Sequence, residues 1–273
     1  MTQVPELPEF ENPPVAEVAI SIEFAPLENW RASDPVKFWS GLRDEYPHFD
    51  IQPPVISFPE DLTGPNWGPT RMSVQQVQAA NQRYWFGTEP TSWLIQVQTD
   101  RFIINWRKAP GAETYPRYIA SVRPRLVREW ERFCAYVRQN ENGELRVKRC
   151  EVSYVNDIPK DECWRTLREG MLLFSPFAGE MPFRFLPQFE TLNLQGSFLF
   201  TDQPGRLHFS IGHALRQTDA KEVLQLNLVA RSDPESSEDE DVMACIDRCR
   251  SWIVQGFTDL TSTHAHTLWG RTR

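Results

Sequence analysis

No stretch of this sequence is apolar enough to cross a membrane, because none reaches the roughly 18 residues that a spanning helix needs. The N-terminal stretch, MTQVPELPEFENPP, is acidic and rich in proline, whereas a secretory signal peptide starts basic and continues apolar. These two absences predict a cytoplasmic protein that has no contact with a membrane.

Cysteine is scarce, and its spacing carries little information. The five cysteines form no CxxC pair and leave an odd count, which fits neither a disulfide framework nor a zinc site. Cys245 and Cys249 lie one helical turn apart, but both fall on an apolar stripe, which favours the core over a metal. We therefore expect neither a metal nor another cofactor.

Positive charge is in short supply. The chain has 29 Lys and Arg against 37 Asp and Glu, a formal charge of −8. Proteins that bind the phosphate backbone show the opposite balance, so a nucleic-acid partner is not expected, although arginines at 117–132 come close to a basic strip. Acidity instead favours a basic protein partner, through electrostatic steering.

Catalytic motifs are missing as well. No Walker loop, GxGxxG, HExxH, nucleophile elbow or paired-carboxylate signature occurs. A catalytic triad can assemble from distant positions, so this absence does not exclude an enzyme. It nominates no catalytic residue, and the balance favours a protein that binds without catalysing.

The chain is instead rich in period-two patterns and aromatic residues, with ten Trp and seventeen Phe. In VAEVAISIEF (15–24), Val18, Ile20 and Ile22 fall on one face, which predicts a half-buried strand. Residues 83–108 predict a meander of three short strands, and residues 189–231 predict a second meander.

A long helical segment follows each meander. The first begins near Ser121 and ends near Asn142, and the second runs from about residue 241 to 269. A shorter helix is expected to start at Ser33, and Ser73 is a possible cap for another. The acidic run at 233–241 fits a solvated cap at the start of the last helix.

Both halves of the chain thus follow one plan: strand, helix, proline-rich excursion, three-strand meander and long helix. We expect a flexible tail at 1–12, a first α+β repeat at 13–142 and a second at 143–271, the two forming one globular domain. With about four strands each, the two sheets must join edge to edge or pack together. The predicted fold is a pseudo-duplicated α+β structure in which a curved antiparallel sheet carries the long helices on one face, as in TATA-binding-protein-like or helix-grip folds.

Four polar residues on the predicted strands are candidate ligand- or partner-binding residues. Asn105 and Arg107 alternate with apolar residues in DRFIINWR, and Tyr154 and Asn156 share a face in EVSYVNDIP. Either they form a buried hydrogen-bond network, or they form the polar floor of a groove.

Two histidines are candidates for acid–base chemistry. His208 and His213, in RLHFSIGHALR, are separated by an odd number of positions, so we expect them on opposite faces of a strand. That placement argues against a shared metal.

Four segments together resemble a sporadically distributed, uncharacterised prokaryotic protein family of about this size: PPVAEVAISIEF, DRFIINWR followed by YPRY, EVSYVNDIP and FTDLTSTHAHTLWGR. The resemblance covers residues 13–271. It implies a bacterial or archaeal cytoplasmic protein and supplies no activity or catalytic residue. Patchy occurrence of this kind is associated with toxin–antitoxin, immunity and phage-defence genes.

The leading functional hypothesis is therefore a non-enzymatic interaction protein, with an immunity-like role toward a protein partner. The alternative is a small-molecule binder or hydrolase that uses the concavity between sheet and helices, with His208 or His213 as acid or base.

Overall fold

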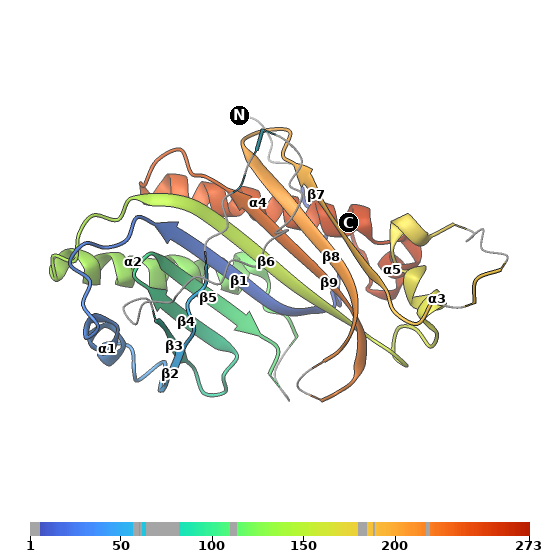
Figure 1. Cartoon of the computed structure of the whole chain (residues 1–273), viewed down its shortest axis with the longest axis horizontal. Coiled ribbons are helices and arrows are strands. Elements are labelled where there is room, and N and C mark those ends of the chain that lie inside the picture. Colours follow the sequence, from blue (N-terminus) through green and yellow to red (C-terminus); the bar gives the residue numbers. More distant parts are fainter. Residues whose placement is uncertain are drawn as a thin grey trace.

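One antiparallel sheet runs through both halves of the chain (Figure 1). The computed structural model describes residues 6–56, 60, 62–63, 82–109, 114–179, 185–187, 189–216 and 219–273. Nine strands of this part form the sheet, in the order β2-β3-β4-β5-β1-β6-β9-β8-β7. The strands are β1 (Val15–Phe24), β2 (His48–Gln52), β3 (Arg83–Gly87), β4 (Trp93–Gln98), β5 (Arg101–Arg107), β6 (Val147–Pro159), β7 (Asn193–Leu199), β8 (Gly205–Leu215) and β9 (Glu222–Ser232). The α-helices of the same part are α1 (Asp34–Ser40), α2 (Arg123–Gln139), α3 (Leu167–Met171), α4 (Asp239–Leu260) and α5 (Thr263–Leu268).

The first strands of the two halves meet at the centre of the sheet. β1 and β6 are antiparallel neighbours, with Ile20 opposite Val152. From this centre the strands of the first half follow in the order β1, β5, β4, β3, β2, and those of the second half in the order β6, β9, β8, β7. The two halves therefore join edge to edge.

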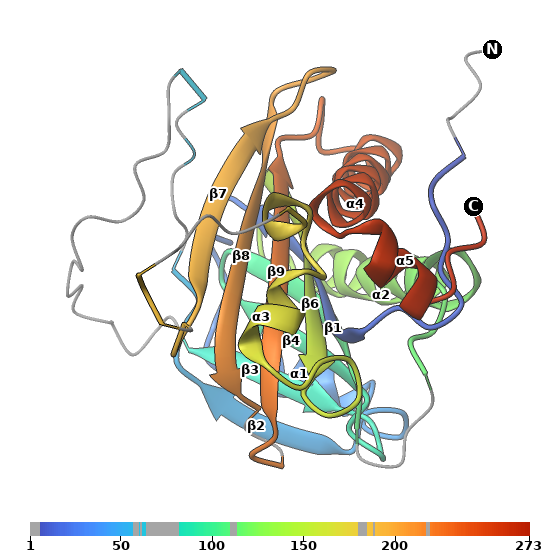
Figure 2. The same ribbon diagram turned by 90° about the vertical axis from the view of Figure 1, so that its right-hand side faces the viewer.

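The long helices α2 and α4 lie on the same face of the sheet (Figure 2), here called the helix face. Aromatic rings fill the space beneath α2: the Phe133 ring lies 5.7 Å from Phe24 on β1 and 5.2 Å from Phe102 on β5. The Trp130 indole donates to Asp239, in the acidic first turn of α4, and so ties the two helices together.

Strict alternation decides which side chains reach this core. On β1, Val18, Ile20 and Ile22 are buried on the helix face, and Glu17 and Glu23 lie on the opposite, open face. The predicted alternation on β1 is thereby confirmed. The two predicted meanders, β3–β5 and β7–β9, and the placement of both long helices on one face (Figure 2) are confirmed as well.

The last helical segment is shorter than predicted. α4 ends at Leu260, Thr261 is extended, and Ser262 caps a separate helix, α5, by accepting a hydrogen bond from the Ala265 amide. The break arises because a Ser side chain that satisfies a free amide favours a new helix start over continuation. None of the described helices is long and apolar enough to span a bilayer.

The proline-rich excursion after α1 contains a strand that the sequence did not reveal. β2 pairs with β3 at the sheet edge, and Phe49 packs 5.1 Å from Trp39 and 5.7 Å from Phe86. Prolines Pro47 and Pro53 flank this strand, which is compatible with an edge position. Ser73 and the helix predicted after it lie outside the described residues.

Residues 6–12, predicted as part of a flexible tail, pack against the end of the chain. Phe10 is buried and lies 5.3 Å from the Phe257 ring, and the Glu11 amide donates to the Gly270 carbonyl over 2.9 Å. Burying one aromatic side chain contributes about 1.5–3 kcal/mol. That contribution offsets the cost of ordering a short segment whose composition alone indicates disorder.

Candidate functional site

A cavity of about 340 Å³ lies on the helix face, beside α4. Five parts of the chain build it: the N-terminal segment at 8–15, the YPRY segment (115–118) with the residue after it, strands β6 and β9, and helix α4. We call it the tyrosine cavity. Its lining includes Phe10, Tyr115, Arg117, Tyr118, Tyr154, Asn156, Arg250, Ile253, Val254 and Phe257.

Hydrogen bonds hold the N-terminal wall of this cavity in place. The Arg117 guanidinium donates to the carbonyls of Phe10, over 2.7 Å, and Glu11, over 3.3 Å. Arg117 follows Pro116, whose ring fixes the backbone of the YPRY segment just before the turn that leads into α2. The wall and the YPRY segment are therefore one connected structure.

Two tyrosine hydroxyls meet at the base of the cavity. The Tyr115 and Tyr154 hydroxyl oxygens lie 2.8 Å apart. Burial raises the pKa of Tyr154, although the neighbouring Tyr115 and the Arg250 guanidinium lower it in part. Burial and the proximity of Tyr154 raise the pKa of Tyr115 well above its usual value. Both phenols are therefore neutral hydrogen-bonding groups at physiological pH.

Arg250 supplies the positive charge of the cavity. Its guanidinium carbon lies 4.6 Å from the centre of the Tyr118 ring, a cation–π contact. Its Nε is buried and makes no hydrogen bond, and no carboxylate of the described residues forms an ion pair with it. The nearby Asp247 instead accepts hydrogen bonds from Tyr118, over 2.7 Å, and from Arg123. A buried donor without a partner is uncommon in folded proteins, so the unsatisfied Nε distinguishes Arg250 among the lining residues.

The four predicted binding residues do not line one groove. Tyr154 and Asn156 share the helix face and line the tyrosine cavity. Asn105 and Arg107 lie on the open face of the sheet, because Asn105 pairs with Ala19 whereas Tyr154 pairs with Val18. One position of register on β1 therefore separates the two pairs onto opposite faces.

Asn105 and Arg107 belong to a hydrogen-bonded surface. The buried Asn105 side chain donates to Glu17 over 2.7 Å and accepts from Gln96. The Arg107 guanidinium carbon lies 5.5 Å from the centre of the Trp85 ring. Asn105, Glu17 and Gln96 thus bond one another, as in the hydrogen-bond-network interpretation of the sequence, whereas the buried Trp85 indole N–H has no hydrogen-bond partner among the described residues.

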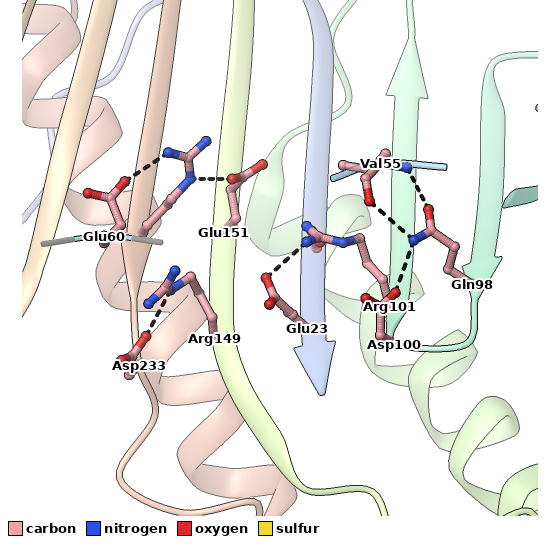
Figure 3. A network of polar contacts seen from close by, with 11 residues as sticks. Glu23, Val55, Glu60, Gln98, Asp100, Arg101, Arg149, Glu151 and Asp233 are labelled. Carbon is pink, nitrogen blue, oxygen red and sulfur yellow. Dashed lines mark hydrogen bonds and ion pairs between the residues drawn. The ribbon is translucent and has the colours of Figure 1, made fainter. Parts of the chain in front are cut away.

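Charged residues fill the centre of the open face (Figure 3). Arg231 bridges Glu60 and Glu151, Arg101 binds Glu23, and Arg149 binds Asp233. Burial raises the pKa of Glu60, but hydrogen bonds from His208 and Arg231 outweigh it and lower that pKa to about 2. A hollow of about 90 Å³ lies among these groups. It is small, and charges of both signs line it, so this network has the features of a structural element.

Val55 and Glu60 both contact side chains of the open face. The Val55 amide and carbonyl both bond the Gln98 side chain, at 2.7 Å and 3.2 Å, near the end of β4 (Figure 3). Glu60, five residues later, is bound by β8 and β9. The described residues of this segment therefore connect strands from both halves of the chain.

The histidines and cysteines considered in the sequence analysis, His208, His213, Cys245 and Cys249, do not line the tyrosine cavity. His208 and His213 point to opposite faces, as predicted: His208 binds Glu60 over 2.6 Å, and His213 binds Glu222 over 2.7 Å. Cys245 and Cys249 are buried in the core, also as predicted. The described residues include no group of three or more His, Cys, Asp or Glu side chains suited to a metal ion.

Sequence reasoning missed Arg250 and the tyrosines of the YPRY segment as cavity residues. A signal for Arg250 exists: it lies four residues after Ile246 and three before Ile253, on the apolar stripe of α4. A charged residue at such a position needs a partner or a ligand. The YPRY segment has no comparable signal, because its position beside β6 depends on the tertiary fold.

No protein-family model matches the chain, and no curated protein matches it.

Proposed function

We propose that this protein binds a small organic ligand in the tyrosine cavity. The observation that carries the proposal is the combination, in one cavity of about 340 Å³, of an arginine without a carboxylate partner and a pair of neutral tyrosine hydroxyls. Cavities of roughly 300–1,000 Å³ with apolar walls and a few convergent polar groups are typical of small-molecule sites. Neither His208 nor His213 lines the cavity, so the proposal is binding rather than hydrolysis.

A thermal-shift screen against acids, amines, sugars and nucleotides tests this proposal. A ligand at 100 times its dissociation constant raises the free energy of unfolding by about 2.7 kcal/mol. Val254→Trp places an indole in the cavity, and Gln255→Trp, on the exposed side of α4, is the matched control. We expect at least one compound to stabilise the wild type and Gln255→Trp but not Val254→Trp. If every hit stabilises all three proteins equally, the tyrosine cavity is not the site.

A second role, binding of a protein partner, is favoured by a different surface. Apolar side chains are exposed on and near β7, the strand at one end of the described sheet: Phe185, Leu186, Phe189, Phe198 and Leu199. β7 carries no charged residue that would discourage pairing. Phe198→Asp, compared with Ser197→Asp on the same strand, tests this role. If a partner binds both variants as tightly as it binds the wild type, it docks on another surface.

We also propose that the chain arose by duplication and belongs to the patchily distributed prokaryotic family that its segments resemble, with an immunity-like role in the cytoplasm. The equivalent strand orders on either side of β1 and β6 support the duplication. A set of homologues whose two halves share no positional preferences would contradict it, and the genes beside those homologues test the immunity-like role.

A further inference from the structure

We propose that the ligand of the tyrosine cavity is a monocarboxylic acid with an apolar body. This inference rests on the proposed ligand-binding role and adds the chemical class. It follows from three properties of the cavity: the hydrogen-bond donors at its base, its net charge and the chemistry of its remaining walls.

The base of the cavity offers hydrogen-bond donors to a ligand. In the pair formed by Tyr115 and Tyr154, one hydroxyl donates to the other, so one O–H remains free to donate elsewhere. The guanidinium of Arg250, which lines the cavity and has no carboxylate partner among the described residues, is a second donor group. The Asn156 side chain donates one N–H to the Leu226 carbonyl over 3.0 Å, and its amide oxygen is an acceptor. Two or more acceptor oxygens on the ligand would satisfy this arrangement.

The charge of the lining favours a single negative charge. Arg117 and Arg250 line the cavity with one acidic residue, Glu9, which gives 2 − 1 = +1. Arg117 already holds the backbone carbonyls of the N-terminal wall, so Arg250 is the cation that faces a ligand. A carboxylate neutralises one guanidinium and matches its geometry. A phosphate monoester carries up to two charges at neutral pH, and the second would stay uncompensated in a partly apolar cavity.

The other walls suit an apolar body. Phe10, Ile253 and Phe257 are buried hydrophobic residues of the lining, and Val254 and Leu228 extend the same surface. At the roughly 30 Å³ that one water molecule occupies in the liquid, a cavity of about 340 Å³ holds about a dozen non-hydrogen atoms. A medium-chain or single-ring acid has this size.

Titration calorimetry with three probes that share one alkyl chain tests the class: octanoate, octanamide and octyl phosphate. We expect octanoate to bind the wild type at least tenfold more tightly than either of the others. Arg250→Met removes the cation and should make octanoate and octanamide equal, whereas Arg250→Lys should keep the preference for octanoate. Arg146→Met, at an exposed position, is the control for loss of an arginine and should leave the preference unchanged.

The outcomes separate this inference from the proposed function. Octanamide that binds as tightly as octanoate, with both blocked by Val254→Trp, overturns the carboxylate class and leaves the ligand-binding role intact. Tighter binding of octyl phosphate also overturns the class. Octanoate that binds equally to the wild type and to Val254→Trp places the acid outside the cavity and refutes the inference directly. If the screen finds ligands of another chemical class and octanoate does not bind, the carboxylate inference is refuted and the ligand-binding role stands.

Discussion

The hydroxyl oxygens of Tyr115 and Tyr154 lie 2.8 Å apart, although 39 positions separate the two residues in the chain. Tyr154 is fixed by β6, and Tyr115 by the segment that enters α2. This contact is thus both part of the base of the cavity and a tertiary link between the sheet and the first long helix.

A double-mutant cycle measures this link. Tyr115→Phe and Tyr154→Phe each leave the other hydroxyl without its buried partner, so each should lower the free energy of unfolding by about 1–3 kcal/mol. The double variant should cost less than the sum of the two, because it leaves no unpaired hydroxyl. Urea unfolding of the four proteins gives the coupling energy. Strict additivity would show that the hydroxyls do not depend on each other.

The buried carboxylate of Glu60 should make stability depend on acidic pH. Its pKa of about 2 lies below the ordinary value of 4.5, so its contribution is present above pH 4.5 and is lost as pH falls toward 2. A difference of this size corresponds to about 3 kcal/mol. We expect Glu60→Gln to lower the unfolding free energy at pH 7 by about 1–3 kcal/mol and to flatten its decline between pH 4.5 and 2.

Glu131→Gln, at an exposed position on α2, is the matched control for Glu60→Gln. It should change stability by less than about 0.5 kcal/mol at pH 7. Urea unfolding from pH 7 down to 2.5 compares both variants with the wild type. Equal acid sensitivity of wild type and Glu60→Gln would mean that other carboxylates dominate acid unfolding.

Most tyrosines should resist ionisation in the folded protein. Five of the six have a raised pKa, and burial is the largest cause for each: Tyr46, Tyr115, Tyr118, Tyr136 and Tyr154. For Tyr46 the pKa is about 12. Absorbance at about 295 nm should therefore report at most one ionised tyrosine before the protein unfolds.

The same shifts predict that stability falls in alkali. The unfolded chain releases tyrosine protons above pH 10 while the folded protein retains them, so the stabilising contribution is complete below pH 10 and is lost above it. Tyr118→Phe should reduce the steepness of this loss. Three or more tyrosines that ionise reversibly near pH 10 without unfolding would contradict the expectation.

Local pattern was sufficient to predict the faces of individual strands. The alternation of Val18, Ile20 and Ile22 placed β1 correctly, and similar alternation separated Asn105 from Trp106 and His208 from His213. Period two is a property of a single strand, so a single sequence contains it.

Register between strands could not be obtained in this way. Whether Asn105 or Trp106 shares a face with Tyr154 depends on which residue of β1 lies opposite each of them, and Val18 pairs with both Trp106 and Tyr154. This pairing is fixed by long-range packing under the helices. The predicted groove therefore combined two pairs of residues that lie on opposite faces of the sheet, Tyr154 and Asn156 on the helix face and Asn105 and Arg107 on the open face.

Contacts between the ends of the chain were equally hidden. Phe10 lies in a stretch whose composition indicates disorder, yet it packs on Phe257 and brackets the tyrosine cavity. Phe10 is stabilised by burial against Phe257, and that surface forms only after α4 has folded. The same reasoning applies to β2, whose pairing with β3 ordered a segment rich in proline.

Gly205, the first residue of β8, lies in a tight junction with the C-terminal half of α4. A Cβ at this position would lie 2.3 Å from the Phe200 ring and 2.8 Å from the Arg231 carbonyl oxygen. The Phe200 ring cannot move aside easily, because it is stacked on Trp252 with ring centres 4.3 Å apart. Gly205→Ala should therefore lower the free energy of unfolding by about 1–3 kcal/mol through overpacking.

Gly179→Ala is the matched control for Gly205→Ala, since a Cβ at Gly179 would meet no atom within 4 Å. Alanine there should leave stability unchanged or raise it by about 0.4–1 kcal/mol, because it restricts only the unfolded chain. Urea unfolding of both variants, followed by circular dichroism, makes the comparison. If Gly205→Ala were as stable as Gly179→Ala, the Phe200–Trp252 stack would have to be free to shift, and the junction between β8 and α4 would be looser than its geometry indicates.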